Sequence, residues 1–418
     1  MLRKIRLVLA VLFTALITLL FLDLTGTLHS YLGWMAKIQF LPAILALNVT
    51  VIVALVLLTL LLGRVYCSVI CPLGVMQDFI AWLSKRGKKR RRYKYGYRRE
   101  WRLVRIFFLV LMLVAIFAGI GSLMSLLAPY SNYGRIVGNL LAPLYGWGNN
   151  LLATIAEHFN SYTFYSVAVW MPSLATFLIA LFMLLLVAYM SWTNGRLYCN
   201  SICPVGTVLG YLSKFSLMRI TIDTDRCTGC KLCSRACKSL CIDSENHRVD
   251  YSRCVACFDC LGECREGALH YRSVLRKKKN TSDATSAESS PEGDDPVGRR
   301  AFLLAGAMMA GSAVLHAQEK RRDGGFAVIE DKVPPARATH LEPPGAQGIR
   351  HFAKHCTSCQ LCVSACPSRV LEPSRDLMNL MQPFMTYERG YCRPECTACS
   401  EVCPSGAITR ITKEEKSS

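Results

Sequence analysis

The chain has 418 residues, 52% of them hydrophobic, and a formal net charge of +20. This length allows two or three domains of ordinary size, and the hydrophobic content indicates membrane-spanning segments. Residues 85–105 hold twelve basic residues and one acid, so one short segment carries more than half of the charge excess. Such a segment fits a cytoplasmic loop held against anionic lipid, and the charge therefore does not indicate a nucleic-acid partner.

Four apolar stretches predict membrane-spanning helices, because each approaches or exceeds the roughly 20 residues that cross a ~30 Å hydrocarbon layer. They are residues 5–22, 40–62, 104–127 and 171–190. With the basic loop in the cytoplasm, the N-terminus and residues 192–300 also face the cytoplasm, and the intervening loops face outside. We expect an α-helical polytopic membrane bundle over residues 1–215.

One motif occurs twice in this region. "GRVYCSVICPLG" at 63–74 and "GRLYCNSICPVG" at 195–206 each follow an even-numbered span, which predicts two repeated helix hairpins. Residues four apart share a helix face, so Cys67 and Cys71 point together, as do Cys199 and Cys203. The four thiols converge if the hairpins pack with pseudo-twofold symmetry. They are then either a metal or redox-thiol site, or buried inert cysteines.

Two cysteine runs, "CTGCKLCSRAC" and "CVACFDCLGEC", fall in the next predicted domain, residues 216–276. Both have the C-x2-C-x2-C-x3-C spacing of bacterial two-cluster ferredoxins, in which the fourth cysteine of each run ligates the other cluster. The first predicted ligand set is Cys227, Cys230, Cys233 and Cys264, and the second is Cys254, Cys257, Cys260 and Cys237. Lys238 and Arg265 replace the usual following prolines, and Cys241 is a spare thiol that can substitute. We expect a small α+β ferredoxin-like domain with two [4Fe-4S] clusters.

Residues 277–298 are polar and rich in Ser, Thr, Gly and Pro, which predicts a flexible linker. The next stretch contains Arg299, Arg300, Phe302 and Leu303 before an apolar run, in the pattern of a twin-arginine export signal. We expect an uncleaved signal anchor over residues 299–317 that places residues 318–418 outside. Cleavage after Ala317 and a cytoplasmic amphipathic helix are the alternatives.

A second pair of cysteine runs, "CTSCQLCVSACP" and "CRPECTACSEVCP", lies in residues 318–418. The third predicted ligand set is Cys356, Cys359, Cys362 and Cys403, and the fourth is Cys392, Cys396, Cys399 and Cys366. Structural zinc is the alternative, but zinc sites usually pair C-x-x-C knuckles and lack triplets with a distant fourth ligand. Four [4Fe-4S] clusters are therefore expected in all. Met378, Met381 and Met385 have helical spacing, which predicts core positions or a docking face.

Residues 1–275 resemble the NapH type of membrane quinol dehydrogenase component, which is related to MauN and NosR-like proteins. The two repeated motifs, the four spans and the paired cysteine runs carry this resemblance. Residues 296–418 resemble NapG, an exported twin-arginine ferredoxin, so the chain resembles a fusion of two subunits. The resemblance implies electron flow from the membrane quinone pool through iron–sulfur clusters to a periplasmic reductase or c-type cytochrome, in the bacterial inner membrane.

No predicted span contains histidine, so a haem held within the bundle is not expected. His29 in the first outer loop, and Tyr133 with Arg135 in the second, are the candidate quinol-site residues. Imidazole accepts a proton near neutral pH, although tyrosines at this depth are also ordinary interfacial anchors. Two other functions remain open: a cupric reductase of metalloenzyme assembly, whose motifs look similar, and a redox sensor.

Overall fold

The structure is a computed structural model. It describes residues 1–23, 26–85, 95–159, 165–167, 169, 174–273, 340–377, 379–388 and 390–417. These residues belong to one compact unit, formed by Met1–Lys278 and His340–Ser418. The predicted linker and signal anchor at 277–317, and Met378, lie outside the described residues.

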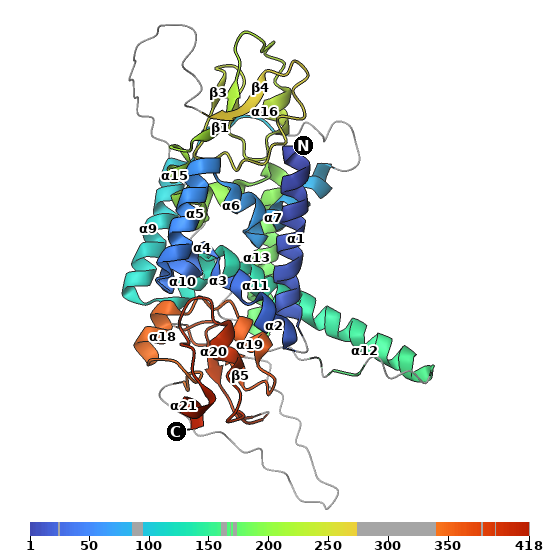
Figure 1. Ribbon diagram of the computed structural model, residues 1–418, viewed down its shortest axis with the longest axis vertical. Helices are drawn as coiled ribbons and strands as arrows, with labels where there is room; N and C mark the ends of the chain where they lie inside the picture. The colour runs from blue at the N-terminus through green and yellow to red at the C-terminus, as the bar shows by residue number, and fades with distance from the viewer. Residues whose placement is uncertain are drawn as a thin grey trace, which may run out of the picture. The chain divides into compact units, whose positions relative to one another are not determined.

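Long apolar helices form the first part of the chain (Figure 1). Two of them, α1 (Leu2–Leu22) and α13 (Leu174–Asn194), have the length and apolar composition that crossing a membrane requires, and α5 (Val49–Leu62) is a shorter apolar helix. At about 1.5 Å per residue, α1 extends about 31 Å. Val8 and Leu12 on α1 are exposed, as expected of side chains that contact lipid.

Two of the four predicted spans are not continuous helices. In the second, α4 (Phe40–Leu45) ends before Leu47, whose φ is 51°, and α5 begins after Asn48, which caps it by accepting from the Val51 amide. In the third, α9 (Arg102–Ala118) ends at Gly119 (φ 73°) and α10 (Gly121–Leu127) follows. A residue in the left-handed region cannot continue a right-handed helix, so the chain turns at both places.

Further helices lie in the connections between these elements. Between α1 and α4 lie α2 (Thr27–Leu32) and α3 (Trp34–Lys37). Between α10 and α13 lie α11 (Pro129–Ile136), a π-helix η1 (Val137–Leu141) and α12 (Ala142–His158). In α12, Leu144, Trp147 and Leu151 are exposed, so this helix presents an apolar surface.

Each repeated motif folds as a short helix, a break at Cys-Pro and a second helix. The first copy forms α6 (Val65–Val69) and α7 (Pro72–Lys85), and the second forms α14 (Leu197–Ser201) and α15 (Pro204–Ser213). The copies exchange partners: α7 packs against α13 of the second half, and α15 packs against α5 of the first (Figure 1). This exchange brings the two motifs together.

The first cysteine-rich segment, residues 218–273, is called here the first cluster domain. Its ends pair as antiparallel strands, β1 (Met218–Ile222) with β4 (Leu269–Ser273), with Ile220 opposite Tyr271. Between them lie α16 (Leu232–Ala236) and the antiparallel pair of β2 (Ile242–Asp243) and β3 (Arg248–Val249).

The second cysteine-rich segment, residues 340–417, is the second cluster domain. Its helices are α18 (Ile349–His355), α19 (Leu361–Ala365), α20 (Ala398–Val402) and α21 (Lys413–Ser417). Strand β5 (Leu371–Pro373) pairs antiparallel with β6 (Pro383–Met385). Met385 therefore lies in a strand, and Met381, with φ 66°, lies in the turn before it. The helical spacing of these methionines does not form a helix, because the left-handed turn precedes the strand.

The two cluster domains contact opposite ends of α1. Arg3 in the first turn of α1 pairs with Asp259 of the first cluster domain at 3.1 Å. At the other end, Phe21 and the Cys359 carbonyl both come so close to Gly134 that an added Cβ there would lie within 2.7 Å of each. Gly134 thereby allows α11, α1 and the second cluster domain to meet.

Candidate functional site

Left-handed residues shape the turns between the cysteines. In three of the four runs, the residues immediately before and after the second cysteine have positive φ. They are Gly229 and Lys231, Ala256 and Phe258, and Ser358 and Gln360. Successive backbone N–H groups in such turns form concavities that bind anions, including iron–sulfur clusters. The backbone of these runs therefore fits a negatively charged cluster.

The structure brings the four thiols of each predicted ligand set within electrostatic range of one another. In the first cluster domain, Cys233 interacts with Cys227, Cys230 and Cys264, and Cys260 interacts with Cys254, Cys257 and Cys237. In the second, Cys362 interacts with Cys356, Cys359 and Cys403, and Cys399 interacts with Cys366, Cys392 and Cys396. In every set, the fourth thiol comes from the other run. The thiols of the first set also line one cavity of about 20 Å³.

Among the described residues, no three or more His, Cys, Asp or Glu side chains gather at the short distances that one metal ion requires. A cubane cluster holds its ligands apart by its own width, so four converging thiols can fit [4Fe-4S] without meeting at one point.

The spare cysteine of the first cluster domain lies beside the second ligand set. Cys241 is fully buried, its sulfur is 3.5 Å from that of Cys237, and it also contacts Cys254. Cys241 is thus close enough to compete with Cys237 as a ligand.

The four thiols of the repeated motifs also converge inside the helical bundle. Cys67, Cys71, Cys199 and Cys203, called here the core thiols, are each no more than 4% exposed. Cys71 and Cys203 both lie within electrostatic range of the thiols of the opposite motif. The amide of Gln77 donates to the Cys199 sulfur at 3.3 Å.

Arginines of the two motifs brace each other across this centre. Arg196 donates to the carbonyl oxygen of Cys67 at 2.7 Å, and Arg64 donates to that of Cys199 at 3.4 Å. The motif glycines allow the close packing, since a Cβ at Gly74 or Gly206 would lie 2.2 Å from the same two carbonyl oxygens. The repeated Arg and Gly therefore have equivalent roles in both copies.

Charge around the core thiols is unevenly balanced. The Asp78 carboxylate forms ion pairs with Arg6, Arg196 and Lys238, with nitrogen–oxygen distances of 2.6, 2.7 and 3.2 Å. Burial alone would lower the pKa of Lys238, but Asp78 and Asp259 raise it. Arg64 is fully buried, and among the described residues no carboxylate pairs with it. Its guanidinium instead lies 3.7 Å from the Cys67 sulfur.

A buried cation without a counterion is costly, and metal-bound thiolates supply the missing negative charge. Arg64 is therefore a buried cation beside the core thiols, which do not form a metal-binding group of three or more side chains in the described part of the chain. Sequence reasoning missed Asp78, although a single acid six residues after Cys-Pro in an apolar helix was an available signal.

Arg135, at the other end of the bundle, is a second buried arginine that resembles Arg64. It is 1% exposed, it contacts Asn132, and it donates to the carbonyl oxygen of Ser125 at 2.8 Å and to the sulfur of Met381 at 3.2 Å. No carboxylate in the described part of the chain pairs with it. The Cys359 thiol lies within electrostatic range, so a cluster bound there would neutralise this cation.

The predicted quinol residues do not gather at one point. The Tyr133 hydroxyl is 2.6 Å from that of Thr18 on α1, whereas Arg135 faces the second cluster domain. His29 is buried, and its Nδ1 is 2.9 Å from the Asp23 carboxylate. Its Nε2 is buried without a hydrogen-bond partner among the described residues.

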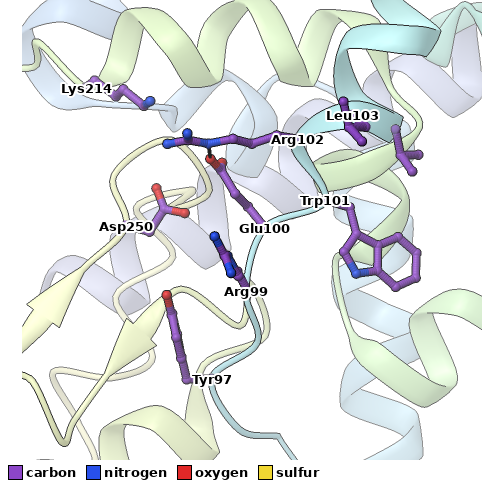
Figure 2. A pocket seen from close by; sticks show the side chains of 9 residues that line it. Tyr97, Arg99, Glu100, Trp101, Arg102, Leu103, Lys214 and Asp250 are labelled. Carbon is purple, nitrogen blue, oxygen red and sulfur yellow. Dashed lines mark hydrogen bonds and ion pairs between the residues drawn. The ribbon is translucent and has the colours of Figure 1, made fainter. Parts of the chain in front are cut away.

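A cavity of about 640 Å³ lies at the start of α9 beside the first cluster domain. Figure 2 shows Glu100 directed toward Arg102 at its centre, with Asp250 opposite. Burial alone would raise the pKa of Glu100, but Arg102 and Arg105 lower it. The Glu100 carboxylate thus forms ion pairs with these two arginines. The cavity is lined mainly by residues of the basic segment and by none of the cysteines.

Two family models match the chain. One described as "4Fe-4S binding domain" matches residues 44–91 and 174–222, the two regions that contain the core thiols. Another of the same description matches residues 220–243 in the first cluster domain. No solved structure matches the chain significantly.

Named relatives each match only part of the chain. MauN, a methylamine utilization ferredoxin-type protein of Paracoccus denitrificans, is 27% identical over 42% of this chain and 48% of its own length. The ferredoxin-type protein NapH of Haemophilus influenzae is 25% identical over 50% of this chain and 62% of its own length. The ferredoxin-type protein NapG of Escherichia coli is 32% identical over 22% of this chain and 43% of its own length. Together, the family models and these relatives show that the chain has 4Fe-4S binding domains and is similar to ferredoxin-type proteins named NapH, MauN and NapG, which supports an iron–sulfur electron-transfer protein.

Proposed function

We propose that this chain takes electrons from membrane quinol, passes them through [4Fe-4S] clusters and delivers them to a periplasmic reductase or c-type cytochrome. The observation that carries the proposal is the position of the two cluster domains, each with two sets of four converging cysteines, at opposite ends of one apolar helix. The four sets would hold the clusters, which supply one-electron redox centres when bound.

The orientation follows from the basic segment. Its described part lies against the first cluster domain: the Tyr95 amide donates to the Arg235 carbonyl at 3.3 Å, and the Arg98 amide donates to the Leu240 carbonyl at 3.4 Å. The positive-inside rule places this end in the cytoplasm. The second cluster domain, at the far end of α1, would then be periplasmic, in a multi-pass protein of the bacterial inner membrane.

The core thiols would connect the two ends. Arg64 links Cys67 to the Ser252 carbonyl of the first cluster domain at 2.9 Å. On the other side, the Tyr198 hydroxyl accepts from Asn132 at 3.1 Å, and Asn132 contacts Arg135 next to the second cluster domain. Polar contacts thus extend from the thiol centre toward both domains. We propose that the core thiols hold a metal or act as redox thiols on this route.

Anaerobic purification in detergent, followed by iron and sulfide analysis, tests the cofactor content. We expect about sixteen irons in the four predicted sets, plus any iron at the core thiols. A reduced menaquinol analogue should then produce reduced-cluster signals in electron paramagnetic resonance. Zinc in place of iron would refute the proposal, and a full iron content that never responds to quinol would refute quinol as the donor.

A double variant, Cys67→Ser with Cys199→Ser, tests the connecting role. In this variant, quinol should reduce the clusters of one domain only, while dithionite still reduces all of them. Reduction of both domains by quinol would exclude the core thiols from the route. Copper bound tightly at the core thiols, without any quinol response in the unmodified protein, would instead establish the cupric reductase alternative.

A further inference from the structure

We propose that quinol is oxidised in a cavity of about 140 Å³ where the end of α1 and the start of α12 meet the second cluster domain. This inference rests on the proposed function and assigns its substrate site. The cavity is close in volume to an engineered ~150 Å³ protein cavity that binds benzene, so it accepts one six-membered ring.

The walls of the cavity combine apolar and polar groups as a quinol headgroup requires. Phe21 and Pro143 contribute apolar surface, and Asp23, Gln360 and Arg369 contribute polar groups. Cys366, a member of the fourth predicted ligand set, is also part of the wall. A ring bound here would therefore lie next to a cluster ligand.

Gln360 supplies a hydrogen-bond donor that the protein leaves unused. Asn139 donates from Nδ2 to the Arg135 carbonyl at 2.9 Å, which fixes its orientation, and it also donates to the Gln360 oxygen at 2.8 Å. Because the Gln360 oxygen faces Asn139, the Gln360 Nε2 points away from Asn139. It is buried without a partner among the described residues, on a side chain only 5% exposed. A buried amide without a partner costs about 1–3 kcal/mol, and a quinol oxygen would satisfy it.

The cavity opens beside an apolar surface. Tyr145 lines it and is 49% exposed, and the same helix exposes Leu144 and Trp147. Tryptophan and tyrosine favour the membrane–water interface. A hydrophobic ligand dissolved in the bilayer can thus reach the cavity from the lipid, which favours a membrane quinol over a water-soluble aromatic compound.

The protons that quinol oxidation releases have acceptors beside the cavity, Asp23 and His29. Oxidation of one quinol to quinone releases two electrons and two protons. The two cysteine sets of the second cluster domain would hold two [4Fe-4S] clusters, which would supply one one-electron acceptor for each of these electrons. Asp23 lines the cavity and contacts His29 Nδ1, so the protons pass to this pair and then to water on the same side of the membrane.

Filling the cavity tests the proposal. Gly138 lies in its wall, and a Cβ added there would meet no atom within 4 Å, so Gly138→Leu should occupy the cavity without displacing neighbours. Gly148 on α12 has equally open space and does not line the cavity, which makes Gly148→Leu the matched control. Both variants are prepared anaerobically as the full chain, and iron content and dithionite-reducible signals are measured in each.

A photoreactive azidoquinone provides a readout that does not depend on turnover. It should label peptides around residues 138–146 and 360–369 in the unmodified protein and in Gly148→Leu. In Gly138→Leu, labelling should disappear and quinol-driven cluster reduction should slow at least tenfold, with iron unchanged. Labelling and reduction at unmodified rates in Gly138→Leu would overturn the cavity and leave the proposed function standing.

If the unmodified protein is neither labelled nor reduced by quinol, the proposed function itself fails, and the cavity assignment fails with it. If Gly138→Leu loses iron, the labelling experiment is repeated with Ala142→Phe, because Ala142 lines the same cavity from α12. Loss of labelling in that variant with iron retained supports the site, and unchanged labelling refutes it.

Discussion

Arg196 donates a 2.7 Å hydrogen bond to the carbonyl oxygen of Cys67, which lies in the other copy of the repeated motif. Arg64 makes the reciprocal contact with the Cys199 carbonyl oxygen. Each motif thus holds the other in place, and the four core thiols converge because of this exchange. The relationship also explains why both copies have an arginine three residues before the first cysteine and a glycine three residues after the second.

Replacing either motif glycine should destabilise the bundle. In Gly74→Ala, the new Cβ would lie 2.2 Å from the Cys67 oxygen, so α6 and α7 must separate. Overpacking of this kind costs about 1–3 kcal/mol. We expect a lower thermal midpoint in detergent, measured by intrinsic fluorescence. Gly138→Ala is the control because its Cβ meets open space, and equal midpoints in the two variants would contradict the packing argument.

Cys237 and Cys241 should differ in their effect on iron content, although their sulfurs are 3.5 Å apart. Cys237→Ser should remove one cluster, about four irons, because Cys237 belongs to the second predicted set. Cys241→Ser should retain all of them. Iron analysis and electron paramagnetic resonance measure both variants. The opposite pattern would make Cys241 the ligand.

Removing the charge of Arg135 should lower the reduction potential of the nearest cluster. A buried cation stabilises the extra negative charge of the reduced cluster, and across roughly 10 Å at an effective dielectric constant near 20 this effect is on the order of tens of millivolts. Arg135→Met should show the shift in a redox titration of the second cluster domain, whereas Arg135→Lys should retain most of the potential. Identical potentials in both variants would exclude an electrostatic role.

Proton acceptance by the Asp23–His29 pair should be required for fast quinol oxidation. A positioned base contributes roughly 10²–10⁴-fold in rate, so His29→Gln should slow quinol-driven reduction by about two orders of magnitude and preserve azidoquinone labelling. Stopped-flow absorbance measures the rate. Tyr31→Phe in the same segment is the control because Tyr31 is 78% exposed. An unchanged rate in His29→Gln would remove this residue from the mechanism.

Charge balance at the core thiols gives a further prediction. If thiolates neutralise Arg64, then Arg64→Met should weaken metal retention at Cys67, Cys71, Cys199 and Cys203, because bound thiolates would lose a buried cation that contacts Cys67 at 3.7 Å. Metal analysis after dialysis against a chelator measures retention. Arg102→Met is the control, since Arg102 is an exposed neighbour of Glu100. Equal retention in both variants would argue against a charged centre in the bundle.

The sequence alone determined the local chemistry. The spacing of the cysteine runs predicted four ligand sets, because three thiols within one short turn can reach a single cluster and the fourth must then come from elsewhere. The two motif copies predicted a central meeting of four thiols. Helix continuity was less predictable: the apolar stretches gave no sign of the turns at Leu47 and Gly119, since hydrophobicity reports contact with lipid and not backbone direction.

Only the tertiary structure decided which distant groups meet. Gln360 lies between two cysteines and has no special sequence context, yet packing against Asn139 leaves its amide free at the wall of a cavity. His29 in the first predicted outer loop, and Tyr133 with Arg135 in the second, were candidates for a quinol site, but each of the three faces a different neighbour. A sequence pattern reports what one segment can bind or bury, whereas burial of charges such as Arg64 and Arg135 depends on which segments enclose them. That enclosure is fixed by the packing of the whole chain.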